Sequence, residues 1–262
     1  MSTFDTDHDA DHPDSPGPGA GEPDGVEIRT LHTADEMVAL AEVFTQVWGS
    51  SKPLVTIEIL MAISHAGGYV SAAYDSGAGD ERMLGASVAI LARHDDRPAL
   101  HSHITGLLPG ARRSGHGRAM TLPQRSRAAA NVFDCITWTF DPLVRRNAWF
   151  NIAVLGVEVH EFLPSFYGTM HDSINAGGDS DRLLVAWPTA STESTETPVA
   201  EADTANALLI PTPEDIVLLR RTDPTAAATW RDTTCHALRD ALDRGDRVIG
   251  FTAQGEYVVE PA

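Results

Sequence analysis

The sequence lacks the marks of several protein classes. It holds only two cysteines in 262 residues, Cys135 and Cys235, and their separation does not match a metal-ligand spacing. Cys135 lies in an apolar run, where a cysteine usually serves as a small buried hydrophobe. No apolar run approaches the length of a membrane span, and no basic-then-apolar signal begins the chain. We therefore expect a cytoplasmic protein with no membrane partner.

Basic residues are scarce, with 19 Lys and Arg against 37 Asp and Glu, which gives a net charge of −18. Eleven of the acids lie in two polar tracts without a basic residue, 1–25 and 193–203, so the rest of the chain carries about −7. That value is ordinary for a soluble domain. Because nucleic acid requires a positive stripe on the protein, a nucleic-acid partner is excluded.

Composition divides the chain into four parts. Residues 1–25 are mostly Asp, Gly, Pro and His and predict a disordered acidic tail. Residues 26–188 form the main domain, and the Ser/Thr/Glu/Pro-rich stretch 189–206 reads as a linker. Residues 207–262 are a small C-terminal extension of helices and strands. We expect it to pack on the main domain or on a second subunit, which leaves a homodimer open.

Hydrophobic periodicity and turn residues predict the elements of both parts. In the main domain these are a strand at 26–31, helices at 33–49 and 54–66, strands at 69–74, 83–91 and 99–108, a helix at 117–130 kinked or split by Pro123, a strand at 132–140, a helix at 144–155, and strands at 157–163 and 181–187. In the extension they are helices at 213–221 and from Pro224 to Gly245, and strands at 247–252 and 256–259.

The most informative stretch is 101–117, HSHITGLLPGARRSGHG. It predicts a strand, a sharp break and the start of a helix, and it contains R-x-x-G-x-G at Arg112, Gly115 and Gly117. Glycines let backbone N–H groups approach a ligand, and a helix N-terminus favours phosphate. The pattern fits neither a P-loop nor a dinucleotide fingerprint. It indicates a site for a small polyanion, the alternative being an ordinary strand-to-helix turn.

Two motifs and the order of elements carry a resemblance. PGARRSGHG matches P-x-x-R-x-x-G-x-G, and NAWFN with the following Leu155-Gly156 matches N-A-x-x-[FL]-Y-x-x-L-G. With the order β-α-α-β-β-β-α-β-α-β-β, the chain resembles the Gcn5-related N-acetyltransferase (GNAT) superfamily. The resemblance implies an α/β (α+β) fold with a mixed, mostly antiparallel sheet flanked by helices. More loosely, the chain is similar to a bacterial subgroup with a C-terminal extension, some of whose members are thought to acylate amino acids, with succinyl-CoA as one donor.

The resemblance also implies a cofactor site. The co-substrate is acetyl-CoA or another short acyl-CoA, with no metal, and the turn after the fourth strand holds its pyrophosphate. The asparagine of the second motif contacts the pantetheine arm, and the aromatic residue packs on the cofactor. The cofactor-binding residues so implied are Leu107, Leu108, Arg112, Arg113, Ser114, Gly115, His116, Gly117, Arg118, Asn147 and Phe150.

The implied reaction is attack of an amine on the acyl thioester. A backbone N–H near Leu107 would stabilise the oxyanion. His101 and His103 share one face of a strand, and an imidazole ordinarily titrates near neutral pH, so each is a candidate general base or else a packing residue. Asp141 is a second candidate base, the alternative being that Asp141-Pro142 only shapes the turn. Asn151 stands where the family has a tyrosine that protonates the thiolate. An amide can donate a hydrogen bond but cannot deliver a proton, so solvent or Tyr167 takes that role.

The acceptor is expected to be a small-molecule amine, and the looser resemblance to the subgroup suggests an amino acid. Arg146 and Arg182, with Asp141, form its predicted binding site, because arginine can hold a carboxylate through two hydrogen bonds. An alternative function is a CoA-binding module with reduced catalysis that acts as a sensor or partner subunit. A third is an interaction protein whose function lies in its tails. Turnover by a chain without residues 1–25 and 189–262 would eliminate the third.

Overall fold

The computed structural model describes residues 26–75, 82–111, 116–170, 179–190 and 206–262. The predicted tail, most of the predicted linker and the motif residues 112–115 lie outside the described residues. The chain divides into two compact units, residues 3–133 and 134–262. We call them the N-terminal and C-terminal units and describe each by itself. Within the described ranges, no helix combines the length and hydropathy needed to cross a bilayer.

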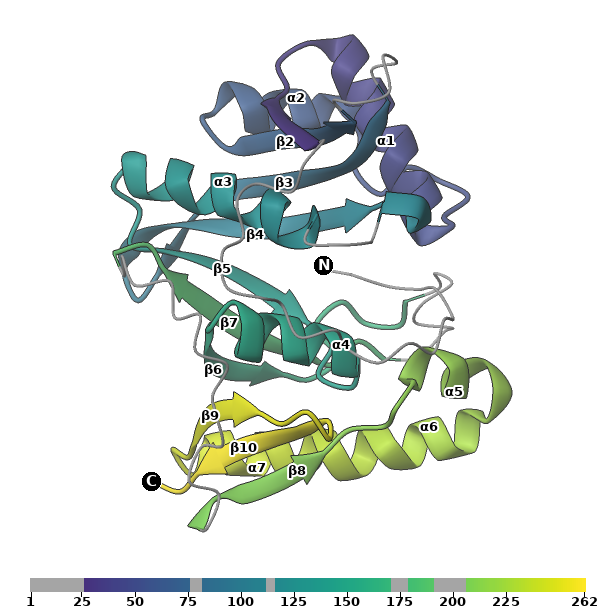
Figure 1. Cartoon of the computed structure of the whole chain (residues 1–262), viewed down its shortest axis with the longest axis vertical. Coiled ribbons are helices and arrows are strands. Elements are labelled where there is room, and N and C mark those ends of the chain that lie inside the picture. Colours follow the sequence, from purple (N-terminus) through teal and green to yellow (C-terminus); the bar gives the residue numbers. More distant parts are fainter. Residues whose placement is uncertain (1–25, 76–81, 112–115, 171–178, 191–205) are drawn as a thin grey trace. The chain divides into compact units, whose positions relative to one another are not determined.

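The N-terminal unit is built on an antiparallel sheet with the order β1-β2-β3-β4. The strands are β1 (Val26–Thr30), β2 (Tyr69–Asp75), β3 (Met83–His94) and β4 (Arg97–Leu107), and the helices are α1 (Ala34–Trp48), α2 (Ile57–His65) and α3 (His116–Ala130). The helices α1 and α2 cover one face of the sheet and α3 covers the other (Figure 1). Six of the seven residues of β2 are buried because both faces are covered.

Local signals place α1 where the sequence predicts it. Thr33 is the N-cap, and its side chain accepts from the backbone N–H of Glu36 while Glu36 reaches back to the N-cap backbone. These reciprocal bonds form a capping box. Gly49, at φ 59°, ends the helix in the left-handed conformation. The stripe from Met37 to Trp48 is buried against the sheet, so the helix is fixed by both its ends and one face.

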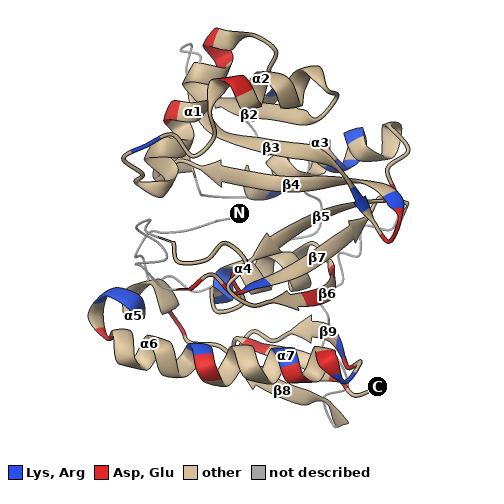
Figure 2. Ribbon diagram, turned by 180° about the vertical axis from the view of Figure 1, so that it is seen from behind, with Lys and Arg blue, Asp and Glu red and all other residues tan. Residues whose placement is uncertain are grey.

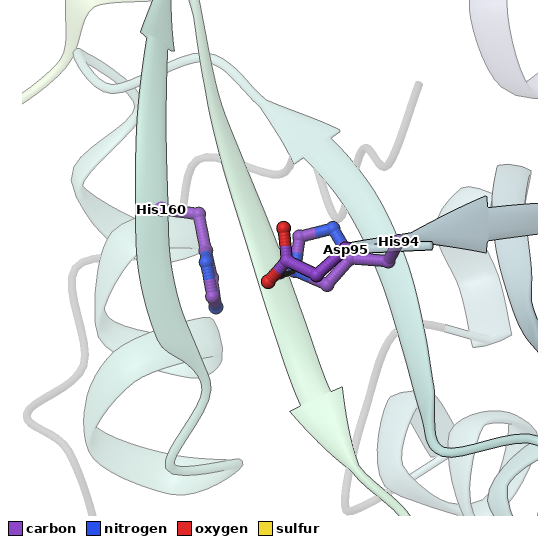
Figure 3. Close-up of side chains that lie close together, drawn as sticks. All are labelled: His94, Asp95 and His160. Atoms are coloured by element: carbon purple, nitrogen blue, oxygen red, sulfur yellow. Dashed lines mark ion pairs between the residues drawn. The ribbon is translucent and has the colours of Figure 1, made fainter. Parts of the chain in front are cut away.

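A two-residue turn joins β3 to β4, since His94 pairs with Arg97. Its residues Asp95 and Asp96 have φ values of 47° and 60°, which define the primed hairpin turn that fits the twist of the strands. Figure 3 shows the His94 and Asp95 side chains projecting from this turn, with His94 Nε2 3.7 Å from the Asp95 carboxylate. His160, also labelled there, lies on strand β6 (Glu158–Leu163) of the other unit, with its Nε2 3.6 Å from the Glu158 carboxylate. In each pair the two residues are at most two positions apart in the sequence.

The sequence predicts that Pro123 kinks or splits its helix, and the predicted split is wrong. The helix α3 runs without interruption through Pro123. A proline removes one backbone hydrogen bond and costs roughly 3 kcal/mol in an unsupported helix. Here the buried side chains of Met120, Gln124 and Ala128 anchor the helix on both sides of the proline. Tertiary packing therefore overrides the local signal.

The C-terminal unit begins with an antiparallel sheet of order β5-β7-β6. These strands are β5 (Cys135–Phe140), β6 (Glu158–Leu163) and β7 (Arg182–Pro188). The helix predicted at 144–155 is α4 (Arg145–Ala148) continued by a π-helical segment, Trp149–Val154. The wider turn shows in the bond from Leu155 N to Phe150 O, which is 2.9 Å long. The sequence pattern did not indicate this widening.

The extension forms a three-stranded antiparallel sheet and a run of helices. The strands, in the order β8-β10-β9, are β8 (Leu208–Pro211), β9 (Arg247–Phe251) and β10 (Glu256–Glu260), and the helical segments are α5 (Ile216–Thr222), α6 (Pro224–Trp230), a π-helical stretch (Arg231–Cys235) and α7 (His236–Asp243). Strand β8 was missed. Asp223 caps α6, because its carboxylate accepts from Ala226 N at 2.9 Å and Pro224 follows it as the first residue of the helix. Acidic and basic residues interleave along α7 (Figure 2).

The extension packs on the main-domain part of the same unit, as one of the two sequence alternatives expected. Helix α7 contacts β6, and β9 contacts both β6 and the π-helical segment 149–154. The order of elements up to β7 is the predicted β-α-α-β-β-β-α-β-α-β-β. The mixed α/β class with antiparallel sheets and flanking helices is thereby confirmed.

Candidate functional site

Strand β4 contains a β-bulge at one of the two predicted bases. Val88 pairs with Ile104 and Ala89 pairs with Ser102, so His103 is an extra residue outside the register of the ladder. A bulge of this kind bends the strand and re-aims a side chain, and bulges are frequent beside functional sites. The sequence placed His101 and His103 on one strand but gave no sign of the bulge.

Burial lowers the pKa of both histidines. It brings the pKa of His101 to about 4, with the charge of the nearby His103 adding to the effect, and it brings the pKa of His103 to about 4 as well. Both imidazoles are therefore neutral at neutral pH and keep a lone pair that can accept a proton. A base with a pKa near 4 is weaker than an ordinary histidine, but it is fully available over the physiological range.

The end of β4 holds the predicted oxyanion region. Leu107 pairs with Gly85 on β3, and its side chain belongs to a buried apolar cluster with Ala111. The N–H of Leu108 donates to Leu84 O at 2.8 Å. The Leu108 amide is therefore engaged within the fold, and the predicted oxyanion donor near Leu107 does not include it. The sequence alone does not show which backbone N–H in this region is already hydrogen-bonded to the neighbouring strand.

The described residues on either side of the glycine motif lie close together. His116, the first residue of α3, has Nδ1 2.8 Å from Ala111 O. Because a carbonyl only accepts, His116 donates this hydrogen bond. Gly117 O accepts from the hydroxyl of Thr121 at 2.8 Å. No acidic residue lies in the first turn of α3, so the positive end of the helix at His116–Arg118 is not neutralised from within the helix.

A chain of buried polar side chains links α3 to β3 and β4. Gln124 Nε2 donates to Ser87 Oγ at 3.3 Å, Ser87 Oγ lies 2.7 Å from Thr105 Oγ1, and Thr105 Oγ1 lies 3.5 Å from Ser102 Oγ. All four residues are at most 8% exposed. Sequence reasoning missed this chain because its members are spread over three elements. It fixes α3 on the strand that carries the two histidines.

In the C-terminal unit, Asn151 lies in the π-helical segment and is 1% exposed. Trp138 Nε1 donates to Asn151 Oδ1 at 3.2 Å. An indole N–H is only a donor, so this bond fixes which end of the amide is oxygen. Among the described residues, the Asn151 amino group has no hydrogen-bond acceptor. A buried donor without an acceptor costs about 1–3 kcal/mol, which makes this group suited to an incoming acceptor atom.

Tyr167 and Arg182 lie next to one another. The Arg182 guanidinium carbon is 5.5 Å from the centre of the Tyr167 ring, a cation–π contact. The Tyr167 hydroxyl lies 3.3 Å from Thr139 Oγ1. Arg182 is 3% exposed and donates to Asp181 O and to the sulfur of Met170. Two predicted site residues are thus brought together, on the β7 side of the unit.

Asp141 is held by the extension. Its Oδ2 is 2.7 Å from Arg220 Nη2, and its Oδ1 accepts from Leu143 N at 2.9 Å. Burial opposes ionisation, but the charges of Arg220 and Arg182 together with these bonds hold the pKa of Asp141 below its ordinary value. A carboxylate so occupied is a poor proton acceptor. This geometry favours a structural role for Asp141 over that of a general base.

Three further predicted residues lie on α4 and the π-helical segment that continues it. Asn147 is 1% exposed, Phe150 is half-buried and Arg146 is exposed. The structure thus groups His101 with His103 in one unit, and Tyr167 with Arg182 in the other. Residues 112–115 remain predictions outside the described residues. Trp138 and Arg220 are the additions that sequence reasoning missed.

Comparison with solved structures places the fold. The chain is similar to a chain of the NatC complex bound to Gag peptide and CoA, with a TM-score of 0.51 and 10% identity over 63% of this chain and 98% of that one. It is also similar to a GNAT superfamily phosphinothricin acetyltransferase from Sinorhizobium meliloti in complex with AcCoA, with a TM-score of 0.50 and 18% identity over 68% of this chain and 97% of that one. No protein-family model matches the sequence, and no curated protein matches it either. The chain therefore has the fold of the GNAT acetyltransferases.

Proposed function

We propose that the protein is an acyl-CoA-dependent N-acyltransferase that moves an acetyl or another short acyl group to a small amine. The observation that carries the proposal is the strand-turn-helix from β4 to α3 within a GNAT fold. Its R-x-x-G-x-G motif starts at Arg112, directly after Ala111, and ends at Gly117 in the first turn of α3, a turn that contains no acidic residue. Such a helix start suits the phosphates of CoA. The two solved structures named above contain CoA or AcCoA.

The proposed chemistry is direct transfer. The amine nitrogen forms a bond to the thioester carbonyl carbon, the carbon–sulfur bond breaks, and the amine gives up a proton. His103 or His101 accepts that proton, because both are neutral at the pH of the reaction. The Asn151 amino group donates a hydrogen bond to the leaving sulfur, and solvent or Tyr167 completes protonation of the thiolate. Arg182 and Arg146 bind a carboxylate of the acceptor, which an amino acid would provide.

A CoA-binding module with little or no catalysis is the second candidate. Asn151 in place of a proton donor and the low pKa of the two histidines favour it. The two candidates share the cofactor and differ in the chemical step. A binding experiment followed by a turnover experiment separates them.

The test is calorimetric titration with acetyl-CoA and then succinyl-CoA, followed by a free-thiol release assay over a panel of amino acids and other small amines. Binding with amine-dependent thiol release supports the transferase, and the preferred thioester identifies the acyl group. Binding without release over the panel supports the binding module. Absence of binding to either thioester refutes both.

Two variants assign the roles. Gly117→Trp should abolish acyl-CoA binding, since a large side chain at the helix start fills the space that a phosphate would need. His103→Ala should lower turnover and leave acyl-CoA affinity unchanged. An equal loss of affinity in both variants would show that His103 is structural.

A further inference from the structure

The extension holds one short turn of the C-terminal unit at three points. The turn is residues 141–145, between β5 and α4. Arg220 of α5 binds Asp141, and the Tyr257 hydroxyl of β10 donates to Pro142 O at 2.7 Å. Arg145, at the other end of the turn, donates from Nε to Thr212 Oγ1 at 3.2 Å and from Nη2 to the Thr212 carbonyl. These contacts come from three separate elements of the extension.

The Asp141–Arg220 pair is largely shielded from water. Its side chains are only 11% and 13% exposed. Tyr257, which holds the neighbouring carbonyl, is fully buried. An ion pair shielded from water fixes geometry strongly, because losing either partner leaves a buried charge without compensation. The pair therefore determines where the turn lies.

The turn is also the start of the helix that follows. Val144 N donates to Asp141 O at 3.2 Å, and Val144 O accepts from Asn147 N at 2.9 Å. The hydrogen bonds of α4 thus begin on residues of the turn. The helix carries Asn147 and, in its π-helical part, Phe150 and Asn151. A displacement of Asp141 therefore displaces three side chains of the predicted acyl-CoA site together.

A second contact of the same kind secures β7. Arg231 of the extension binds Asp181 through two hydrogen bonds, of 2.7 and 2.8 Å, and also reaches Asp179 at 3.0 Å. Asp181 directly precedes Arg182, the predicted acceptor-binding residue, and its carbonyl accepts from that arginine. The extension thus contacts the sheet beside both groups of predicted site residues in this unit.

We propose that the C-terminal extension is a built-in part of the site and that Arg220 is a positioning residue for the helix carrying Asn147, Phe150 and Asn151. This inference rests on the proposed function for the identity of the ligand, but not for the positioning itself. Arg220 acts through Asp141 and does not need to touch substrate. The extension is therefore required for acyl-CoA to bind in a defined geometry.

The experiment compares full-length variants by hydrogen exchange and by acetyl-CoA titration. Arg220→Met removes the charge while keeping most of the volume, and Arg220→Lys restores a cation. Arg239→Met is the matched control. The Arg239 side chain on α7 is 41% exposed, and among the described residues its one ion pair is a 3.7 Å contact with the adjacent Asp240. Should Arg220→Met not fold, Asp141→Asn removes the same ion pair from the other side.

We expect Arg220→Met to speed amide exchange in residues 143–151 and to weaken acetyl-CoA binding roughly tenfold, since small displacements of positioning groups have large effects. Arg220→Lys should recover most of the loss, and Arg239→Met should match the wild type. Unchanged exchange in 143–151 together with unchanged affinity would overturn the proposal, as would a uniform rise in exchange with unchanged affinity. A wild-type chain that does not bind acetyl-CoA would refute the proposed function, while the exchange pattern would still decide the positioning.

Discussion

Mild acid should destabilise the fold through His101 and His103. Both have a pKa of about 4 in the native state, against about 6.5 in an unfolded chain. Between these values the unfolded chain binds protons that the native protein does not. Stability is therefore fully present above about pH 6.5 and is lost as the pH falls towards 4.

The magnitude follows from the shift. A pH of 5 lies about 1.5 units below the pKa of a histidine in the unfolded chain. Protonation of each histidine then stabilises the unfolded state by about 2 kcal/mol, at 1.36 kcal/mol per unit. The two together give up to about 4 kcal/mol. Partial exposure of both side chains reduces this figure, so we expect a loss of roughly 2–4 kcal/mol between pH 7.5 and 5. That is a large part of the 5–15 kcal/mol typical of a folded protein.

Urea unfolding at pH 7.5, 6.5, 5.5 and 5.0 measures the effect. The double variant His101→Gln, His103→Gln should show a much flatter dependence of unfolding free energy on pH, and each single variant should show about half of the change. His65→Gln, at the exposed end of α2, is the control and should follow the wild type. A double variant with the wild-type pH dependence would refute the reasoning, because another group would then carry the linkage.

Further predictions concern single positions. Val132, which follows α3, is 80% exposed and has a φ of 60°, a conformation that is costly for a β-branched residue. Val132→Gly should therefore raise the free energy of unfolding, measured by urea titration, by about 1 kcal/mol. A decrease would show that the valine is not strained. Gly255 has φ 87°, and an added Cβ would collide with the Arg145 guanidinium, so Gly255→Ala should lower the melting temperature by about 4–8 °C for a loss of about 2 kcal/mol. Trp138→Phe removes the donor that orients Asn151 and should lower thiol-release turnover several-fold, whereas Trp187→Phe, its edge-on neighbour in the core, should not; equal losses would indicate a packing effect.

The parts of the fold that sequence predicted are those determined by neighbouring residues. Thr33 with Glu36 specifies the start of α1, and Asp223 with Pro224 specifies the start of α6. In each case the interacting groups are within four residues of one another, so the pattern and the bond coincide.

The parts that sequence could not give depend on distant residues. Arg220 and Asp141 are 79 residues apart in the chain, and no pattern in either segment marks the other as its partner. The bulge at His103 depends on how β3 pairs with β4. The uninterrupted passage of α3 through Pro123 depends on what the helix packs against. Each required the tertiary structure before it could be stated.

The two Asp–Arg pairs between the extension and the main-domain part change how the extension should be tested. Phe140 pairs with Leu183 between β5 and β7, so Asp141 and Asp181, each next to one of these strands, lie at the same end of the sheet. Removing the extension would leave both carboxylates without their arginines. Breaking a buried pair such as Asp141–Arg220 costs about 3–5 kcal/mol. Loss of the Asp181–Arg231 pair, whose arginine is 33% exposed, adds a smaller amount, so the sum is a large part of the stability of a typical domain. Inactivity of a chain truncated after residue 188 would therefore reflect unfolding as readily as loss of a separate function, and only single substitutions such as Arg220→Lys separate the two.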